Sequence, residues 1–178
     1  YYSGNLTEEK GFFRVLEVAK MVADRRRDTN FVLNVVSNSE PIEFKNLPSN
    51  LKLNIQPWQR FYEFCEEVGD NDIYLDLRDN DLENRHCLPI KLFYYMAAGR
   101  PVIYTDLKAI KKGVPDCEQF GFFHSEKDLE GISNLVLKYI DDELLYQTHC
   151  RNSLNLSKEK YNWELIEDDL ITFVRDVV

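Results

Sequence analysis

The chain alternates short runs of strand-forming residues with segments of helical periodicity, and this alternation limits the folds that it can adopt. The runs rich in Val, Ile, Phe and Tyr are residues 1–3, 31–37, 51–55, 72–77, 101–105 and 120–124. A repeated order of strand, helix and strand requires right-handed crossovers and a parallel sheet that is covered on both faces. We therefore predict an α/β fold, a Rossmann-like doubly wound parallel sheet of about six strands with helices on both faces.

Helical spacing of apolar residues marks the segments between these runs. Residues 11–27 place Phe12, Leu16, Ala19 and Val22 at this spacing. Residues 58–69 do the same with Phe61, Phe64, Cys65 and Val68, which we expect to point inward. From Lys127 the pattern is helical almost to the end, so we predict a helical C-terminal tail whose last helix is anchored by packing of Trp163.

Length and composition indicate one domain. The 178 residues, 44% of them hydrophobic, suffice for one well-buried core, so we predict a single domain over 1–178. The chain opens on "YYSGN" without a methionine, and we interpret it as a fragment of a longer protein. No apolar run reaches the roughly 18 residues of a membrane span. The net charge of -9 disfavours nucleic acid as a partner, because it repels phosphates.

The metal-ligating residue types lack the spacing of a metal site. The four cysteines (Cys65, Cys87, Cys117 and Cys150) show no paired spacing for zinc or a redox dithiol, so we expect reduced thiols in a cytoplasmic protein. His124 and His149 are expected to be structural or exposed. Asp76, Asp79 and Asp81 could suggest a divalent cation, but interleaved Asp and Asn also form ordinary turns. We expect no metal and no cofactor.

The turn after the first strand, "GNLTEEKG", is a candidate anion site. Gly4 permits a close turn, and Lys10 with Gly11 stands at the start of the next helix. The free N–H groups and the dipole at a helix start attract anions. By itself, a glycine after a strand more often marks a simple turn. The G-x-G-x-x-G fingerprint and the P-loop lysine motif are both absent from the sequence, which disfavours ordinary dinucleotide and P-loop sites.

A second candidate follows the fourth strand, where Pro89 suits the first position of a helix and Lys91 lies in its first turn. A lysine there costs about 0.3–1 kcal/mol against the helix dipole unless an anion is bound beside it. The alternative is a lysine that bends away into water. Because ligands of doubly wound sheets lie beyond the carboxyl ends of the strands, the two turns together suggest a shared diphosphate site.

Four stretches carry a resemblance to a known family. "GNLTEEKGF" (4–12), "CLPIKLFYYMAAGRPVIYTD" (87–106), "GFFHSEKDLEGIS" (121–133) and "KYNWE" (160–164) resemble, in that order, the C-terminal donor-binding half of a GT-B-fold glycosyltransferase. The similarity is to retaining enzymes of glycosyltransferase family 4 and their bacterial polysaccharide-building relatives, in capsule or lipopolysaccharide synthesis. It covers essentially the whole chain.

The resemblance implies a function for the full-length protein. It would move a sugar from a nucleoside-diphosphate sugar to a glycan or lipid-linked acceptor, as a hexosyltransferase that needs no metal. The acceptor would be held by an N-terminal half that is missing here, so we expect the isolated fragment to transfer no sugar. The resemblance also implies a cytoplasmic protein, peripheral to the inner face of the membrane through the missing half.

The resemblance also implies site residues. Those for the donor diphosphate are Gly4, Asn5, Lys10, Leu88, Pro89 and Lys91. Lys10 matches the lysine of the family's first turn, whereas Asn5 stands where the family usually has an arginine.

Two glutamates separated by seven residues are usual in the family's later motif, and His86 and Tyr94 occupy their places here. These two residues are assigned to the donor sugar or ribose, and Gln56 and Pro57 to the nucleotide base. Trp58 could lie near the base, but an aromatic residue at a helix start is more often part of the core. The catalytic residues are unknown.

Two other classes of protein fit the same alternation. A degenerate, non-catalytic module for nucleotide binding or assembly would account for the missing arginine and glutamates. A flavodoxin-like or receiver-like regulatory domain should show an exposed aspartate after an early strand, yet the first and third strands run into "GNL" and "QPW". Titration with nucleoside diphosphates and their sugars separates the transferase from the degenerate module.

Overall fold

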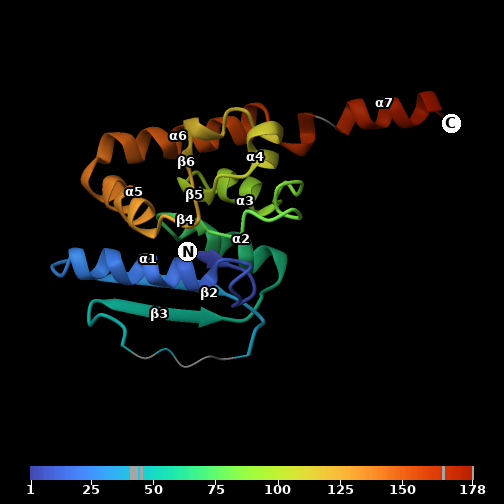
Figure 1. The fold of residues 1–178 in the computed structure, drawn as a ribbon. Coiled ribbons are helices and arrows are strands. Elements are labelled where there is room, and N and C mark those ends of the chain that lie inside the picture. The colour runs from blue at the N-terminus through green and yellow to red at the C-terminus, as the bar shows by residue number, and fades with distance from the viewer. Residues whose placement is uncertain (41–43, 45, 166, 178) are drawn as a thin grey trace.

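The computed structural model describes residues 1–40, 44, 46–165 and 167–177, and it confirms the predicted α/β fold (Figure 1). All six expected strands form; they are β1 (Tyr2–Ser3), β2 (Phe31–Val36), β3 (Leu51–Gln56), β4 (Tyr74–Asp76), β5 (Val102–Thr105) and β6 (Gly121–His124). They form two parallel three-stranded sheets, β1-β2-β3 and β4-β5-β6.

Hydrogen bonds along β1 and β4 join the two sheets. The amino group of Tyr1 donates to the carbonyl of Ile73 at 2.8 Å, and the N–H of Leu75 donates to the carbonyl of Tyr1 at 3.0 Å. The strands therefore run in the spatial order β3-β2-β1-β4-β5-β6, which is the order of a doubly wound nucleotide-binding sheet.

Helices connect and cover the strands. They are α1 (Phe12–Arg25), α2 (Phe61–Gly69), α3 (Lys91–Ala97), α4 (Lys108–Gly113), α5 (Leu129–Asp141), α6 (Glu143–Glu159) and α7 (Glu167–Val177), with short 3-10 helices η1 (Cys117–Gln119) and η2 (Trp163–Leu165). The sequence pattern did not predict α4. The helical C-terminal tail is confirmed, and α7 extends away from the rest of the chain (Figure 1).

Alternation of side chains along the strands creates two cores. In β2, Val35 lies in a core with α1 and α5, whereas Val36 lies in a second core with α2, α3 and α4. In β5, Ile103 lies in the first of these cores and Tyr104 lies in the second. Because successive side chains of a strand point to opposite faces, both faces of the sheet are covered, as the sequence predicted.

Several local expectations were wrong. Helix α2 begins at Phe61, and both Phe61 and Cys65 are exposed, so only Val68 among its expected inward residues is fully buried. The side chain of Trp58 is 56% exposed and not part of the core.

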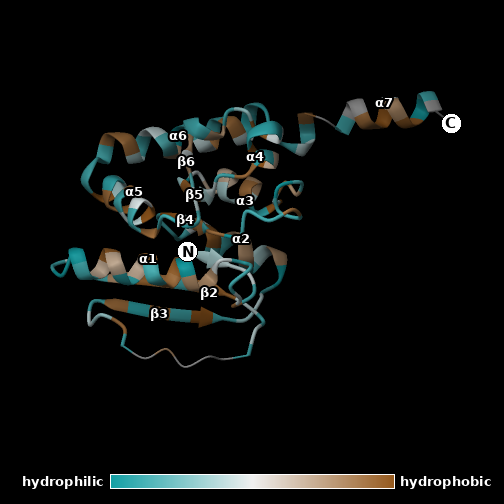
Figure 2. Cartoon of the chain, viewed as in Figure 1, coloured by the Kyte–Doolittle hydropathy of each residue, from teal (hydrophilic) through white to brown (hydrophobic). Residues whose placement is uncertain are grey.

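The expected anchoring by Trp163 was also wrong, because this residue is 58% exposed. Hydrophobic and hydrophilic residues alternate along α7 (Figure 2), and Leu170, Ile171 and Phe173 are exposed on it. Within the described ranges, no helix combines the length and the apolar character that a membrane crossing requires. All four cysteines are free thiols.

Candidate functional site

The carboxyl ends of β1 and β4 lie side by side at the point where the strand order reverses, which is where doubly wound sheets bind ligands. Ser3 ends β1 and Asp76 ends β4. The Gly4 turn follows β1, and α3 lies beyond β4 in the chain. Residues far apart in the sequence therefore meet at this edge.

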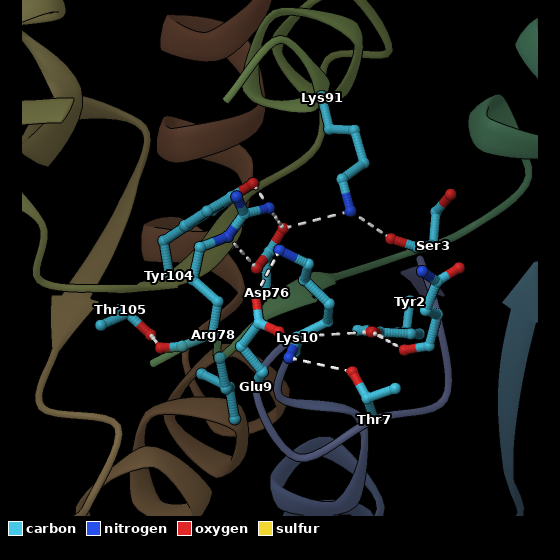
Figure 3. Close-up of polar contacts among 12 residues, drawn as sticks. Tyr2, Ser3, Thr7, Glu9, Lys10, Asp76, Arg78, Lys91, Tyr104 and Thr105 are labelled. Atoms are coloured by element: carbon cyan, nitrogen blue, oxygen red, sulfur yellow. Dashed lines mark hydrogen bonds and ion pairs between the residues drawn. The ribbon is translucent and has the colours of Figure 1, made fainter. Parts of the chain in front are cut away.

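A buried carboxylate is the centre of the site. Both oxygens of Asp76 accept hydrogen bonds from Arg78, at 2.8 Å from Nε and 2.6 Å from Nη2. The hydroxyl of Tyr104, on β5, donates to Asp76 Oδ2 at 2.6 Å. The side chain of Asp76 is only 2% exposed. Figure 3 shows Arg78, Tyr104 and Lys91 directed at this carboxylate.

Lys91 is the third partner of Asp76. Its Nζ lies 3.4 Å from Asp76 Oδ2, donates a hydrogen bond to the carbonyl of Ser3, and lies 5.8 Å from the centre of the Tyr2 ring. The side chain is 25% exposed, so the alternative of a lysine bent away into water was wrong. The sequence expectation placed Lys91 against a helix dipole, but the structure adds a carboxylate that offsets its charge.

The Gly4 turn and Lys91 lie together, as the two-turn hypothesis required. A Cβ atom built on Gly4 would lie 3.4 Å from Lys91 Nζ. The hydroxyl of Tyr2 holds the turn, because its single hydrogen lies between the carbonyls of Asn5 at 2.7 Å and Lys10 at 3.2 Å. Lys10 pairs with Glu9 at 2.6 Å on the exposed side of the turn.

The start of α1 is less open to an anion than the sequence suggested. The N–H of Gly11 donates to the carbonyl of Glu8, and the N–H of Phe12 donates to the carbonyl of Thr7. Helix α3 has only seven residues and begins at Lys91, so Pro89 lies before the helix and not at its first position. The charged side chains, more than the helix ends, make this edge attractive to an anion.

Within the described part of the chain, no hydrogen bond or ion pair joins the other expected site residues to Asp76. Leu88 packs at Gly113, where an added Cβ would lie 2.7 Å from its Cδ2. His86 and Asn5 are exposed, and Pro89 is buried.

The ring of Tyr94 packs edge-on against Phe61 and Phe64 of α2, with ring centres 5.9 and 5.6 Å away. Gln56 ends β3, and its side-chain oxygen accepts a hydrogen bond from Gln59 at 2.8 Å. The exposed Pro57 follows it, next to Trp58. Phe61, Tyr62 and Tyr94 thus form an aromatic patch after the Gln56 turn.

Arg78 is the site residue that sequence reasoning missed. The signal was present in "LDLRD", because an acid and a base two positions apart at a strand end can share one face. The aspartates considered for a metal have separate partners. Asp76 pairs with Arg78, Asp79 pairs with Arg14, and Asp81 accepts a hydrogen bond from the N–H of Asn84 at 2.8 Å.

The charges of the cluster change the pKa of Asp76. Burial alone would raise this pKa, but Lys91 and Arg78 outweigh burial, so the pKa lies below its ordinary value of 3.8. Burial lowers the pKa of Lys91, and Asp76 only partly offsets this effect. The carboxylate is therefore charged, and its interaction with the two cations stabilises the folded chain at neutral pH.

We expect this interaction to make folding sensitive to acid. Because the pKa of Asp76 is lower in the folded state, the unfolded state binds more protons near pH 3.8, and the stabilisation is lost as pH falls below that value. The measurement is urea unfolding at several pH values, for the parent and Asp76→Asn. Asp116 and Asp128 also have lowered pKa values, so both proteins lose stability in acid, but Asp76→Asn should lose less. Equal losses of stability in acid for the parent and Asp76→Asn would contradict the lowered pKa of Asp76.

A cavity of about 460 Å³ lies at the opposite edge of the sheet. It is lined by Phe31–Asn34 at the amino end of β2, by residues 70–73 ahead of β4, and by Val18 and Val22 of α1. Its position at the amino ends of the strands makes it a poor candidate for the chemistry, because ligands of this fold lie at the carboxyl edge.

Comparisons with known proteins extend the structural description. No family model and no curated protein matches the sequence significantly. Solved structures do match; the C-terminal domain of the glycosyl transferase group 1 family protein LpcC from Francisella tularensis superposes with a TM-score of 0.70 at 18% identity, over 92% of this chain and 84% of that one.

Two longer proteins match as well. TarM of S. aureus has a TM-score of 0.71 at 15% identity, and HepE of Anabaena, solved with UDP-glucose, has a TM-score of 0.73 at 11% identity. They cover 96% and 98% of this chain, which spans only 33% of TarM and 48% of HepE. The fold is thus that of the C-terminal domain of GT-B glycosyltransferases.

Proposed function

We propose that the chain is the donor-binding half of a glycosyltransferase, and that it binds the diphosphate of a nucleotide sugar between the Gly4 turn and α3. One observation carries this proposal. Lys91 and Arg78 meet at the switch point between β1 and β4, with Lys10 at the same edge. That is the edge at which sheets of this type receive nucleotides.

Charge development explains what these residues would do. As the bond between sugar and phosphate breaks, negative charge builds up on the leaving diphosphate. Lys91 already lies in a partly dry position, where an interaction with an anion is stronger than in water. A phosphate oxygen would take the place of the Ser3 carbonyl as a partner of Nζ, while Asp76 keeps Arg78 and Lys91 from moving.

Exposed aromatic residues that follow β3 support the placement of the base. Trp58, Phe61 and Tyr62 are each more than half exposed, close in sequence to Gln56 and Pro57 at the end of β3. Exposed aromatic rings offer stacking surfaces for a base. HepE was solved with UDP-glucose and a TarM variant with UDP, which supports a nucleotide ligand for this fold.

The acceptor, the membrane location and the transfer of sugar concern the longer protein. We infer that an N-terminal half holds a glycan or lipid-linked acceptor at the inner face of a membrane, in a pathway such as capsule or lipopolysaccharide synthesis. Orienting two reactants is worth roughly 7–11 kcal/mol of barrier, so the isolated chain would bind the donor without transferring its sugar.

A binding module without transfer is the second candidate. It is favoured by the positions of His86 and Tyr94, where the resembling family has glutamates. His86 is exposed, and the ring of Tyr94 packs on α2. Sugar transfer by the longer protein, once joined to its N-terminal half, would decide against this candidate.

We expect Lys91→Ala to weaken binding of UDP by about 1.5–3 kcal/mol, the range for a hydrogen bond to a charged group. Binding of uridine, which lacks the phosphates, should change much less. The variant should also lose stability, because removing Lys91 leaves Asp76 with one cation fewer. Calorimetric titration with both ligands and thermal unfolding without ligand provide the measurements.

Lys52→Ala is the matched control, since Lys52 is an exposed lysine near the amino end of β3. It should leave UDP affinity and stability unchanged. Equal UDP affinities of the Lys91→Ala variant and the parent would remove Lys91 from the site. Binding of UDP to neither protein would refute the proposed function.

A further inference from the structure

A hollow at the carboxyl edge of the sheet is not part of the proposed donor site. It has a volume of about 470 Å³ and is lined by Asn80, Arg85, Asp106, Lys108 and Lys111. Asn80 and Arg85 follow β4, and the other three follow β5. The hollow is a neighbour of the Asp76 cluster, because Thr105 at the end of β5 donates to the carbonyl of Arg78 at 2.7 Å.

Hydrogen bonds hold the polar lining in position. Arg85 Nε donates to Asn80 Oδ1 at 2.8 Å, and Asn80 Nδ2 donates to the backbone carbonyl of Asp106 at 3.3 Å. Lys111 Nζ lies 2.9 Å from Asp106 Oδ1. The contact of Arg85 is to a neutral amide, so this contact leaves its positive charge unneutralised.

The hollow is positively charged in a strongly negative chain. Its lining contains the three cations Arg85, Lys108 and Lys111 and the single carboxylate of Asp106. Glu118 lies 3.7 Å from Lys111, but its side chain is 75% exposed. The whole chain has more acidic than basic residues and a net charge of -9. An excess of cations in this hollow is therefore opposite to the overall composition.

We propose that this hollow is a second anion subsite, which binds the carboxylate or phosphate group of an acidic sugar. A guanidinium group can bind two oxygens of a carboxylate or of a phosphate at once, and Lys108 adds a second positive charge. Recognition of the anion rests on these residues, and the assignment to a sugar rests on the proposed function.

Two sources of the acidic group share this chemistry. Arg85 precedes His86, a residue that the family resemblance assigns to the donor sugar or ribose, so the group could be the carboxylate of a nucleotide-linked uronic acid. It could instead be part of the acceptor. Comparison of UDP-glucuronate with UDP-glucose separates the two sources, because only a donor carboxylate would make UDP-glucuronate bind more tightly in an Arg85-dependent way.

The test is an NMR titration of the 178-residue chain with glucose 6-phosphate, glucuronate and glucose. The two acidic sugars should shift the amide signals of Arg85 and of residues 106–111, and glucose should not. The double variant Arg85→Ala/Lys108→Ala should weaken glucose 6-phosphate binding about tenfold, as expected for the loss of charge-assisted hydrogen bonds. Both side chains are exposed, so the fold should tolerate the change.

Separate readouts distinguish this subsite from the donor site. The double variant should bind UDP like the parent, whereas Lys91→Ala should bind glucose 6-phosphate like the parent. Binding of glucose 6-phosphate without binding of UDP would refute the proposed function and leave the anion subsite standing. Equal shifts from glucose and glucose 6-phosphate, or unchanged glucose 6-phosphate affinity in the double variant, would overturn the subsite.

Discussion

Asp76→Ala is expected to lower the free energy of unfolding by about 3–5 kcal/mol, the usual cost of removing one partner of a buried ion pair. The carboxylate of Asp76 is 2% exposed and accepts hydrogen bonds from Arg78 and Tyr104, with Lys91 nearby. Without it, two cations at the end of β4 face each other in a region that is mostly closed to water. Urea unfolding near neutral pH measures the loss.

Asp106→Ala is the control for this substitution. Asp106 also follows a strand at the carboxyl edge and also pairs with a lysine, but both side chains of that pair are more than 40% exposed. Its removal should cost no more than about 1 kcal/mol, as for other surface pairs. A loss of similar size in both variants would show that the Asp76 cluster is no more than an ordinary surface ion pair.

The expected cost of Asp76→Ala does not mean that the cluster exists for stability. Replacing a whole buried ion pair with apolar residues of similar volume often leaves stability unchanged or raises it. We infer that Arg78 and Lys91 are held here because a cationic edge is useful for binding an anion. The carboxylate of Asp76 then keeps the two cations in place when no ligand is present.

The six strands and the helices on both faces of the sheet could be predicted from the sequence because they depend on periodicity, whereas the exact strand order comes from the pairing in the structure. All six strand runs appear where β-branched and aromatic residues are concentrated, and the buried faces follow the alternation of side chains. Helix α2 was placed less well. Its residues Phe61 and Cys65 match the helical pattern but remain exposed, because apolar spacing does not reveal which face a neighbour covers.

The site was harder to predict because it depends on contacts between distant residues. Glycine at position 4 and lysine at 91 were recognised from local turn chemistry, and the structure brings them together. The pairing of Lys91 with Asp76 has no local signal, since α3 and β4 are joined by a loop whose path the sequence does not specify. Arg78 was missed for the same reason, because its role depends on a contact of its side chain with Asp76 that the sequence does not specify.

Gly11→Ala should be among the most damaging single substitutions in the chain. Gly11 precedes α1 with a φ of 81°, in the left-handed region, and a Cβ there would lie 2.1 Å from the carbonyl oxygen of Leu77. A left-handed alanine costs about 1–2 kcal/mol, and the clash adds about 1–3 kcal/mol, so we expect a loss of about 2–5 kcal/mol. The clash involves backbone on both sides, so a side-chain rotation cannot relieve it.

The expected damage reaches the site as well as the fold. Any shift that relieves the clash moves the start of α1 away from Leu77 and Arg78, and with it the turn that carries Gly4 and Lys10. Gly69→Ala is the matched control, because Gly69 ends α2 with open space around its Cβ position. It should change stability by at most about 1 kcal/mol, in the stabilising direction. Urea unfolding and UDP titration of both variants test the prediction. A Gly11→Ala protein as stable as Gly69→Ala would show that the start of α1 does not pack this closely against Leu77, the residue after β4.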